Sequence, residues 1–131
     1  MSEETQKPLY EVIGGESKVR ELVNAFYRNM DTLSEAKEIR AQHKDLNEAN
    51  QKLFEFLSGW MGGPNLYIEK HGHPRLRARH LPFQIGIRER DQWMLCMNKA
   101  LEECQIAGDA KRILHASLSR LADHMRNQHE S

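Results

Sequence analysis

The stretch HGHPRLRARHLPF, from His71 to Phe83, is the most informative segment of this chain. It places three histidines and three arginines within thirteen residues. Pro82 disfavours helical backbone at Leu81, so a helical turn that carries Arg77 to His80 is predicted to end there. A histidine at the end of such a turn can donate its Nδ1–H to a carbonyl of the preceding turn. That bond would leave Nε2 free to bind a metal.

Three other interpretations of this segment stay open from the residues alone. His80 is equally an ordinary capping residue, because a charged imidazole suits the C-terminus of a helix. A second interpretation is a zinc site built from the three histidines His71, His73 and His80. Zinc usually takes three or four ligands, and no cysteine or HExxH partner stands nearby. The third is a phosphate or nucleic-acid patch made by the four cations Lys70, Arg75, Arg77 and Arg79.

Length and charge narrow the class of protein. The chain has 131 residues, enough for one domain with a real core. Lysine plus arginine equals aspartate plus glutamate at 19 each, which argues against a nucleic-acid binder because such proteins are usually strongly basic. The polar start MSEETQKP does not have the pattern of a signal peptide. No run approaches the roughly 18 apolar residues of a membrane span, so we expect a cytoplasmic protein without membrane association.

The two cysteines, Cys96 and Cys104, are predicted to be reduced. On one helix they would lie about 12 Å apart, at about 1.5 Å per residue. A disulfide needs Cα atoms within about 7 Å. Both thiols are therefore interpreted as small core residues of a protein in a reducing compartment.

Helical periodicity dominates the chain and predicts an all-α protein. Apolar residues recur at three- and four-residue steps in four segments, which run from Val19 to Met30, Leu46 to Trp60, Trp93 to Cys104 and Ile113 to Met125. Asp45 or Asn47 is the predicted N-cap of the second helix, and Gly62-Gly63-Pro64 ends it. A short helical stretch is expected near 34–42, and an irregular connection from Gly62 to about Pro74. No alternating strand pattern occurs.

Five motifs resemble those of the bacterial truncated haemoglobins of the second group, also called the O group. They are YEVIGG at 10–15, FYRNM at 26–30, GWMGGPNLY at 59–67, HGHPRLRARHLPF at 71–83 and RDQWMLCM at 90–97. Their order and spacing are more specific than any one motif. The resemblance implies a two-over-two sandwich of helices around haem b, which is iron protoporphyrin IX. It makes residues 1–131 one globin domain, with a haem-binding core of about 8–125 and frayed polar termini.

The resemblance also assigns the residues nearest the iron. His80 matches the proximal iron ligand, because it precedes Pro82-Phe83 as the family's histidine does. Tyr27 and Trp93, which otherwise read as core residues, match the distal tyrosine and the tryptophan whose indole N–H points at bound ligand. His43 resembles the residue at the turn before the distal helix, which gives a third candidate donor, although the following stretch KDLNEA is about one residue shorter than in relatives.

The remaining haem contacts are predicted from what a porphyrin requires. Ala49 and Leu53 match two apolar positions that face the ligand. Apolar walls are expected from Leu53, Phe56, Leu76, Phe83, Ile85 and Met97. Arg79 is the expected partner of the propionates, because a planar guanidinium suits a carboxylate, with Tyr67 and Lys52 as weaker candidates.

These residues predict a tight binder of dioxygen, and the resemblance implies that nitric oxide and carbon monoxide also bind. Bound dioxygen carries partial negative charge, so Tyr27 and Trp93 should slow its release. The alternative is a haem enzyme that detoxifies nitric oxide or peroxide, which would need a separate reductase because the chain has no flavin or nicotinamide motif. A haem-free helical interaction module is a distant third. We expect a monomer or a homodimer.

Overall fold

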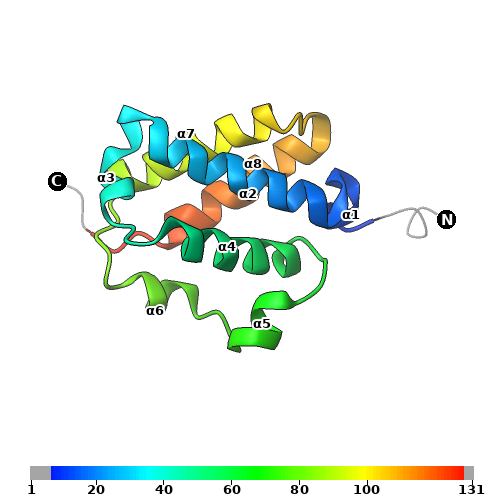
Figure 1. The fold of residues 1–131 in the computed structure, drawn as a ribbon, viewed down its shortest axis with the longest axis horizontal. Coiled ribbons are helices and arrows are strands. Elements are labelled where there is room, and N and C mark those ends of the chain that lie inside the picture. Colours follow the sequence, from blue (N-terminus) through cyan, green and yellow to red (C-terminus); the bar gives the residue numbers. More distant parts are fainter. Residues whose placement is uncertain (1–6, 129–131) are drawn as a thin grey trace.

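Four long helices form the framework of the protein (Figure 1). The structure is a computed structural model that describes residues 7–128. Helices α2 (Gly15–Thr32) and α4 (Leu46–Trp60) pack against each other, and so do α7 (Ile87–Glu103) and α8 (Gly108–His124). Because α2 also packs on α7, one pair lies over the other, which confirms the predicted all-α, two-over-two fold. Within 7–128, none of the helices is long and apolar enough to cross a membrane.

Shorter helical segments connect this framework. They are α1 (Leu9–Ile13), the 3-10 helix η2 (Ser34–Ala36), α3 (Lys37–Ala41), α5 (Leu66–His71) and α6 (Leu76–His80). The expected helical stretch near 34–42 is confirmed as η2 and α3, and the turn that ends before Pro82 is confirmed as α6. Leu81 nevertheless keeps helical backbone angles (φ −57°, ψ −33°), so the expected restriction at this residue is wrong. The expectation of irregular structure from Gly62 to Pro74 is wrong over α5. Six residues make too few turns to reveal an apolar period, and α1 escaped prediction for the same reason.

Helix α4 begins at a side-chain cap. The carboxylate of Asp45 accepts a hydrogen bond from the backbone N–H of Glu48 at 3.1 Å. This bond satisfies one of the N–H groups that a first helical turn leaves without a partner. Of the two predicted caps, Asp45 is therefore correct, and Asn47 lies inside the first turn.

The N-terminal segment crosses the end of α4 over the pair Gly62-Gly63. The backbone N–H of Tyr10 donates to the carbonyl of Met61 at 3.0 Å. A Cβ on Gly63 would lie 2.6 Å from the Tyr10 ring, and one on Gly62 would lie 2.6 Å from Cβ of Pro8. Gly62 also has a φ of 92°, in the left-handed region that favours glycine. The glycine pair is thus what allows this close crossing.

The core lies between the two helix pairs. Its most deeply buried side chains come from all four long helices and include Leu22, Phe26, Met30, Leu57, Met97, Leu101, Leu114 and Leu118. Asn29 is one of the polar side chains buried in these helices, and its amide donates to the carbonyl of Cys96 at 3.2 Å and to Glu103 at 3.3 Å. The predicted apolar stripes therefore meet as expected, and the polar group among them is satisfied.

Cys96 and Cys104 are free thiols with 0% and 2% of their surface exposed. Their predicted place in the core is confirmed. Burial raises the pKa of each thiol to about 11. The thiolate is the reactive form of cysteine, so both side chains should be chemically inert in the folded protein.

This inertness can be measured with a thiol reagent such as DTNB. At pH 8, a pKa of about 11 leaves roughly one thiol in a thousand ionised. We expect neither cysteine to react in the native protein and both to react at once in denaturant. Stoichiometric reaction of one thiol before unfolding would contradict the burial of these groups.

Glu55 is a buried carboxylate that joins α5 to α4. Its side chain is 5% exposed and accepts hydrogen bonds from Gln51 at 2.9 Å, from Lys70 at 3.1 Å and from a ring nitrogen of His71 at 3.0 Å. Burial by itself would raise the pKa of Glu55, but these hydrogen bonds outweigh it and hold the pKa below its ordinary value. The ionised carboxylate therefore anchors the C-terminal half of α5.

Replacing this carboxylate should destabilise the protein in a pH-dependent way. We expect Glu55→Gln to lower the free energy of unfolding by about 1–3 kcal/mol near neutral pH, because the amide matches its cationic partners poorly. Since the pKa is lowered in the folded state, this contribution is complete above the ordinary glutamate pKa and is lost as the pH falls through the lowered value.

Urea denaturation at several pH values measures this difference. The gap between wild type and Glu55→Gln should narrow towards acid, and a gap that does not change with pH would count against the role of the ionised carboxylate. Glu48→Gln is the matched control, because Glu48 is exposed and pairs only with exposed Lys52, at 3.8 Å. It should change stability by less than about 0.5 kcal/mol.

Candidate functional site

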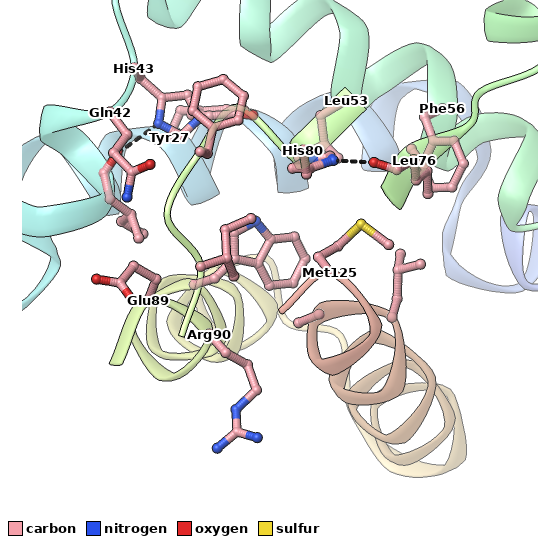
Figure 2. Close-up of a pocket in the computed structure, with 16 residues that line it drawn as sticks. Tyr27, Gln42, His43, Leu53, Phe56, Leu76, His80, Glu89, Arg90 and Met125 are labelled. Carbon is pink, nitrogen blue, oxygen red and sulfur yellow. Dashed lines mark hydrogen bonds between the residues drawn. The ribbon is translucent and has the colours of Figure 1, made fainter. Parts of the chain in front are cut away.

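A cavity opens between the two helix pairs and is closed on one side by α6 (Figure 2). It holds about 920 Å³ of empty space, including its open mouth. The lining residues are mostly apolar, and they are Tyr27, Ile39, Gln42, His43, Leu53, Phe56, Leu76, His80, Phe83, Ile85, Glu89, Arg90, Trp93, Leu121, Ala122 and Met125.

His80 reaches this cavity from the last position of α6. Its Nδ1–H donates to the carbonyl of Leu76 at 2.6 Å, which is the bond expected from the sequence. A neutral imidazole that donates through Nδ1 carries its lone pair on Nε2. The ring is therefore held in one tautomer, with Nε2 available as a metal ligand.

Tyr27, from α2, and Trp93, from α7, line the same cavity as His80. The ring of Phe26 joins them, with ring centres 4.8 Å from Tyr27 and 4.9 Å from Trp93. The Tyr27 hydroxyl donates to the carbonyl of Ala49 at 3.3 Å. Burial raises the pKa of Tyr27, so its hydroxyl stays protonated and remains a donor. The indole N–H of Trp93 makes no hydrogen bond within residues 7–128, and the residue is only half-buried.

His43 differs from the expectation of a third donor. Its Nδ1–H donates to the carbonyl of Ile39 at 2.8 Å, and its ring centre is 6.0 Å from that of Tyr27. In a neutral ring Nε2 therefore carries a lone pair and accepts hydrogen bonds. His43 donates into the cavity only when its ring is protonated.

Most of the predicted apolar walls lie on the cavity. They are Leu53 and Phe56 from α4, Leu76 from α6, and Phe83 and Ile85 from the segment that follows. Met97 does not line it and is fully buried in the core. The reason is that Met97 lies one turn beyond Trp93 on α7, where that face of the helix already contacts the core.

The predicted polar partners lie outside the cavity lining. Arg79 is exposed, its Nε donates to the carbonyl of Pro74 at 2.7 Å, and its guanidinium lies 5.8 Å from the centre of the Tyr67 ring. Tyr67 in turn lies 6.4 Å from the ring of Phe56, which is a wall residue. Lys52 pairs with Glu48 on the surface of α4. Arg79 and Tyr67 therefore lie together behind one wall.

The zinc interpretation finds no support in the described part of the chain. His71 bonds to Glu55, and Nδ1 of His73 accepts a hydrogen bond from the backbone N–H of Arg75 at 3.1 Å. No group of three histidine, cysteine or acidic side chains among residues 7–128 is arranged to hold a metal. His80 therefore does not share a metal with the other two histidines of the segment.

Some lining residues were not predicted from the sequence. They are Ile39, Gln42, Glu89, Arg90, Leu121, Ala122 and Met125. Leu121 and Met125 do belong to an apolar stripe, but periodicity cannot separate a cavity wall from a core. The two charged residues in this set are both paired with groups outside the cavity. Arg90 pairs with Asp123 at 2.6 Å, and Glu89 accepts from the backbone N–H of Gly86 at 2.8 Å and pairs with Arg88 at 3.0 Å.

These features fit a haem. A porphyrin needs a flat apolar slot and an axial ligand, and the cavity offers apolar walls and the lone pair of His80. Two apolar side chains that follow His80 in the sequence, Leu81 and Phe83, are 58% and 41% exposed. An apolar ring in the slot would cover Phe83, which is a wall residue. Fold and site together thus define a haem-binding globin.

The chain belongs to the bacterial-like globin family, whose sequence profile matches residues 8–127. It is 41% identical over 122 residues to the group 2 truncated hemoglobin YjbI of Bacillus subtilis. The matched region covers 93% of this chain and 90% of that relative. A group II 2-on-2 hemoglobin from Agrobacterium tumefaciens has a TM-score of 0.92 and 46% identity, over 95% of this chain and 98% of that one.

A third relative is a truncated haemoglobin from Bacillus subtilis whose structure is described as oxygen-avid. It has a TM-score of 0.84 and 40% identity, over 92% of this chain and the whole of that one. These likenesses confirm the resemblance to the second group of truncated haemoglobins. Membership of this family implies a haem cofactor and the binding of gaseous ligands such as dioxygen.

Removing the imidazole of His80 tests its place in the site. We expect His80→Ala to abolish or greatly weaken the Soret band of five-coordinate ferrous protein after haem reconstitution. His73→Ala is the matched control, because His73 belongs to the same segment and contacts only backbone. It should keep the wild-type spectrum. An unchanged ferrous spectrum in His80→Ala would rule out His80 as the iron ligand.

Proposed function

We propose that this protein binds dioxygen, and also nitric oxide and carbon monoxide, with a haem b that His80 holds. The observation that carries the proposal is one apolar cavity lined both by an imidazole whose Nε2 lone pair is available and by two hydrogen-bond donors, Tyr27 and Trp93. A haem held by His80 would supply an iron that can bind a diatomic ligand. In this proposal, residues 1–131 form the single globin domain that binds haem and the gaseous ligand.

His80 holds the cofactor from the proximal side. The short bond from Nδ1–H to the carbonyl of Leu76 raises the electron density on Nε2 and strengthens it as a ligand. The terminal nitrogens of Arg79 have no partner among residues 7–128, so they are free to bind a propionate. Tyr67, which stacks beside Arg79, and Lys52 are the other candidates for the propionates.

On the distal side, Trp93 and Tyr27 stabilise the bound ligand. The indole N–H of Trp93 is already free. The hydroxyl of Tyr27 rotates from the carbonyl of Ala49 into the cavity, so its net contribution is the difference between two hydrogen bonds. A hydrogen bond to a charged acceptor contributes about 1.5–3 kcal/mol. At about 1.4 kcal/mol per decade, this is one to two decades in the rate of ligand release.

Dioxygen dissociation from variants of these two donors tests the proposal. We expect Trp93→Phe and Tyr27→Phe to release dioxygen roughly 10- to 100-fold faster, with Tyr27 at the lower end because it gives up a bond to Ala49. Trp60→Phe is the control, since Trp60 stacks on Phe56 but does not line the cavity. Dioxygen release rates equal to wild type in both variants would show that Tyr27 and Trp93 do not stabilise the bound ligand.

One observation favours a second function, in which the protein reacts with peroxide. Nε2 of neutral His43 carries a lone pair in the cavity, as a general base for hydrogen peroxide requires. Nitric oxide detoxification is a related alternative that depends on slow release of dioxygen. Either reaction needs an electron donor from outside this chain, and the two free thiols suit the reducing cytoplasm where a reductase would act.

The variant His43→Phe separates ligand binding from peroxide chemistry. If His43 is the base, the substitution should slow the reaction with hydrogen peroxide by roughly 10²-fold or more. Its dioxygen release rate should stay within about twofold of wild type, because the neutral ring donates no hydrogen bond to the ligand. A peroxide rate unchanged by the substitution would eliminate the peroxidase-like function and leave dioxygen binding as the proposal.

A further inference from the structure

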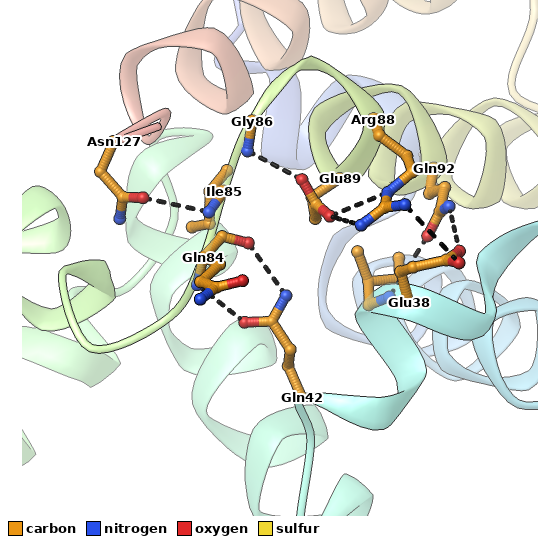
Figure 3. Close-up of polar contacts among 10 residues, drawn as sticks. Glu38, Gln42, Gln84, Ile85, Gly86, Arg88, Glu89, Gln92 and Asn127 are labelled. Carbon is orange, nitrogen blue, oxygen red and sulfur yellow. Dashed lines mark hydrogen bonds and ion pairs between the residues drawn. The ribbon is translucent and has the colours of Figure 1, made fainter. Parts of the chain in front are cut away.

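Asn127 lies just beyond α8, and its side chain contacts the backbone of the segment that follows His80 (Figure 3). Its Nδ2 donates to the carbonyls of His80 at 3.1 Å and Phe83 at 2.9 Å. Its Oδ1 accepts from the backbone N–H of Ile85 at 3.0 Å. The expectation of a frayed end from about residue 126 is therefore wrong up to Gln128, and residues 129–131 lie outside the described part.

Further contacts hold the same two segments together. The backbone N–H of Asn127 donates to the carbonyl of Ile85 at 2.8 Å. On the other side of His80, the guanidinium of Arg77 donates to the carbonyls of His124 at 2.8 Å and Arg126 at 2.7 Å. The end of α8 is thus bound to the chain both before and after His80.

The far end of the segment is fixed independently. The side-chain amide of Gln42 exchanges two hydrogen bonds with the backbone of Gln84, at 2.9 and 3.0 Å, and Glu89 holds the N–H of Gly86 (Figure 3). These contacts do not reach His80 itself. Among residues 7–128, Asn127 is the residue outside the segment 75–86 that bonds to the backbone of His80.

We propose that Asn127 is a positioning residue for His80, which sets the tilt of the imidazole and thereby the strength of its bond to iron. The inference rests on the proposed role of His80 as the iron ligand. Three contacts define the orientation of His80: Nδ1 bonds to Leu76, and the backbone carbonyl accepts from the side chain of Asn127 at 3.1 Å and from the backbone N–H of Phe83 at 3.0 Å. Without Asn127, only the local bond from Phe83 holds this carbonyl, and His80 loses its bond to the end of α8. The imidazole would then be held less firmly in the orientation that presents Nε2 to the cavity.

The iron–histidine stretching band of ferrous, ligand-free protein measures this bond directly by resonance Raman spectroscopy. We expect Asn127→Ala to move the band to lower frequency and to broaden it. Asn127→Asp keeps the acceptor for Ile85 but loses the donors to His80 and Phe83, so it should shift the band in the same direction. Asn98→Ala is the control, because the Asn98 side chain contacts only exposed His115, and its band should match wild type.

A second readout is the rate at which ferric haem passes to an excess of apomyoglobin. Loss of the Asn127 side-chain bonds should accelerate this transfer about tenfold or more. Exchange of the Ile85 amide proton in the apoprotein should also quicken in Asn127→Ala but not in Asn127→Asp, which retains that acceptor. This measurement does not depend on haem.

The outcomes separate the two ideas. If wild type shows an iron–histidine band and both Asn127 variants keep it unchanged, Asn127 is merely structural and the inference is wrong, even where the melting temperature falls. If wild type itself lacks the band, His80 is not the ligand and the proposed function fails with it. If Asn127→Ala does not fold, Asn127→Asp decides the question alone.

Discussion

The hydrogen bond from Nδ1 of His80 to the carbonyl of Leu76 is the contact on which the site depends. Both residues belong to α6, a helix of only five residues that cannot continue past Pro82. The bond selects one tautomer and turns one nitrogen of the ring to the cavity. Without it either nitrogen can carry the proton, and a ligand for iron is no longer prepared in advance. The rest of the fold brings two hydrogen-bond donors, Tyr27 and Trp93, to the same cavity.

Two kinds of force hold this arrangement. The long helices are fixed by apolar burial, since α2 and α7 contribute fully buried faces to one core. Each short segment buries only a few apolar side chains, and helices of five or six residues are not stable by themselves. Polar contacts fix them instead: Glu55 holds α5 to α4, Arg77 holds α6 to the end of α8, and Asn127 and Gln42 hold the segment after His80. The proximal side of the site therefore depends on hydrogen bonds between elements far apart in the sequence.

This division explains what the sequence could predict. The four long helices, the cap Asp45 and the end of α6 follow from periodicity and local chemistry, and the five motifs point to the right family. Helices α1 and α5 are too short to show a period. Met97 has the helical spacing expected of a cavity wall residue, but it lies one turn beyond Trp93 on α7 and is buried in the core instead. The role of His43 depends on a bond to Ile39 that only the structure shows, and Asn127 is 47 residues from His80, so no local pattern connects them.

The bond between the Tyr27 hydroxyl and the carbonyl of Ala49 has a consequence for ligand exchange. Because the hydroxyl has an acceptor before any ligand arrives, the empty pocket does not leave Tyr27 as an unsatisfied buried donor. In the proposed function this hydroxyl would move between a resting acceptor on α4 and the ligand, so the backbone of that helix would compete with dioxygen for the same proton. A small displacement of α4 towards or away from Tyr27 would therefore tune how long the pocket retains its ligand, without any change in the residues that contact the ligand.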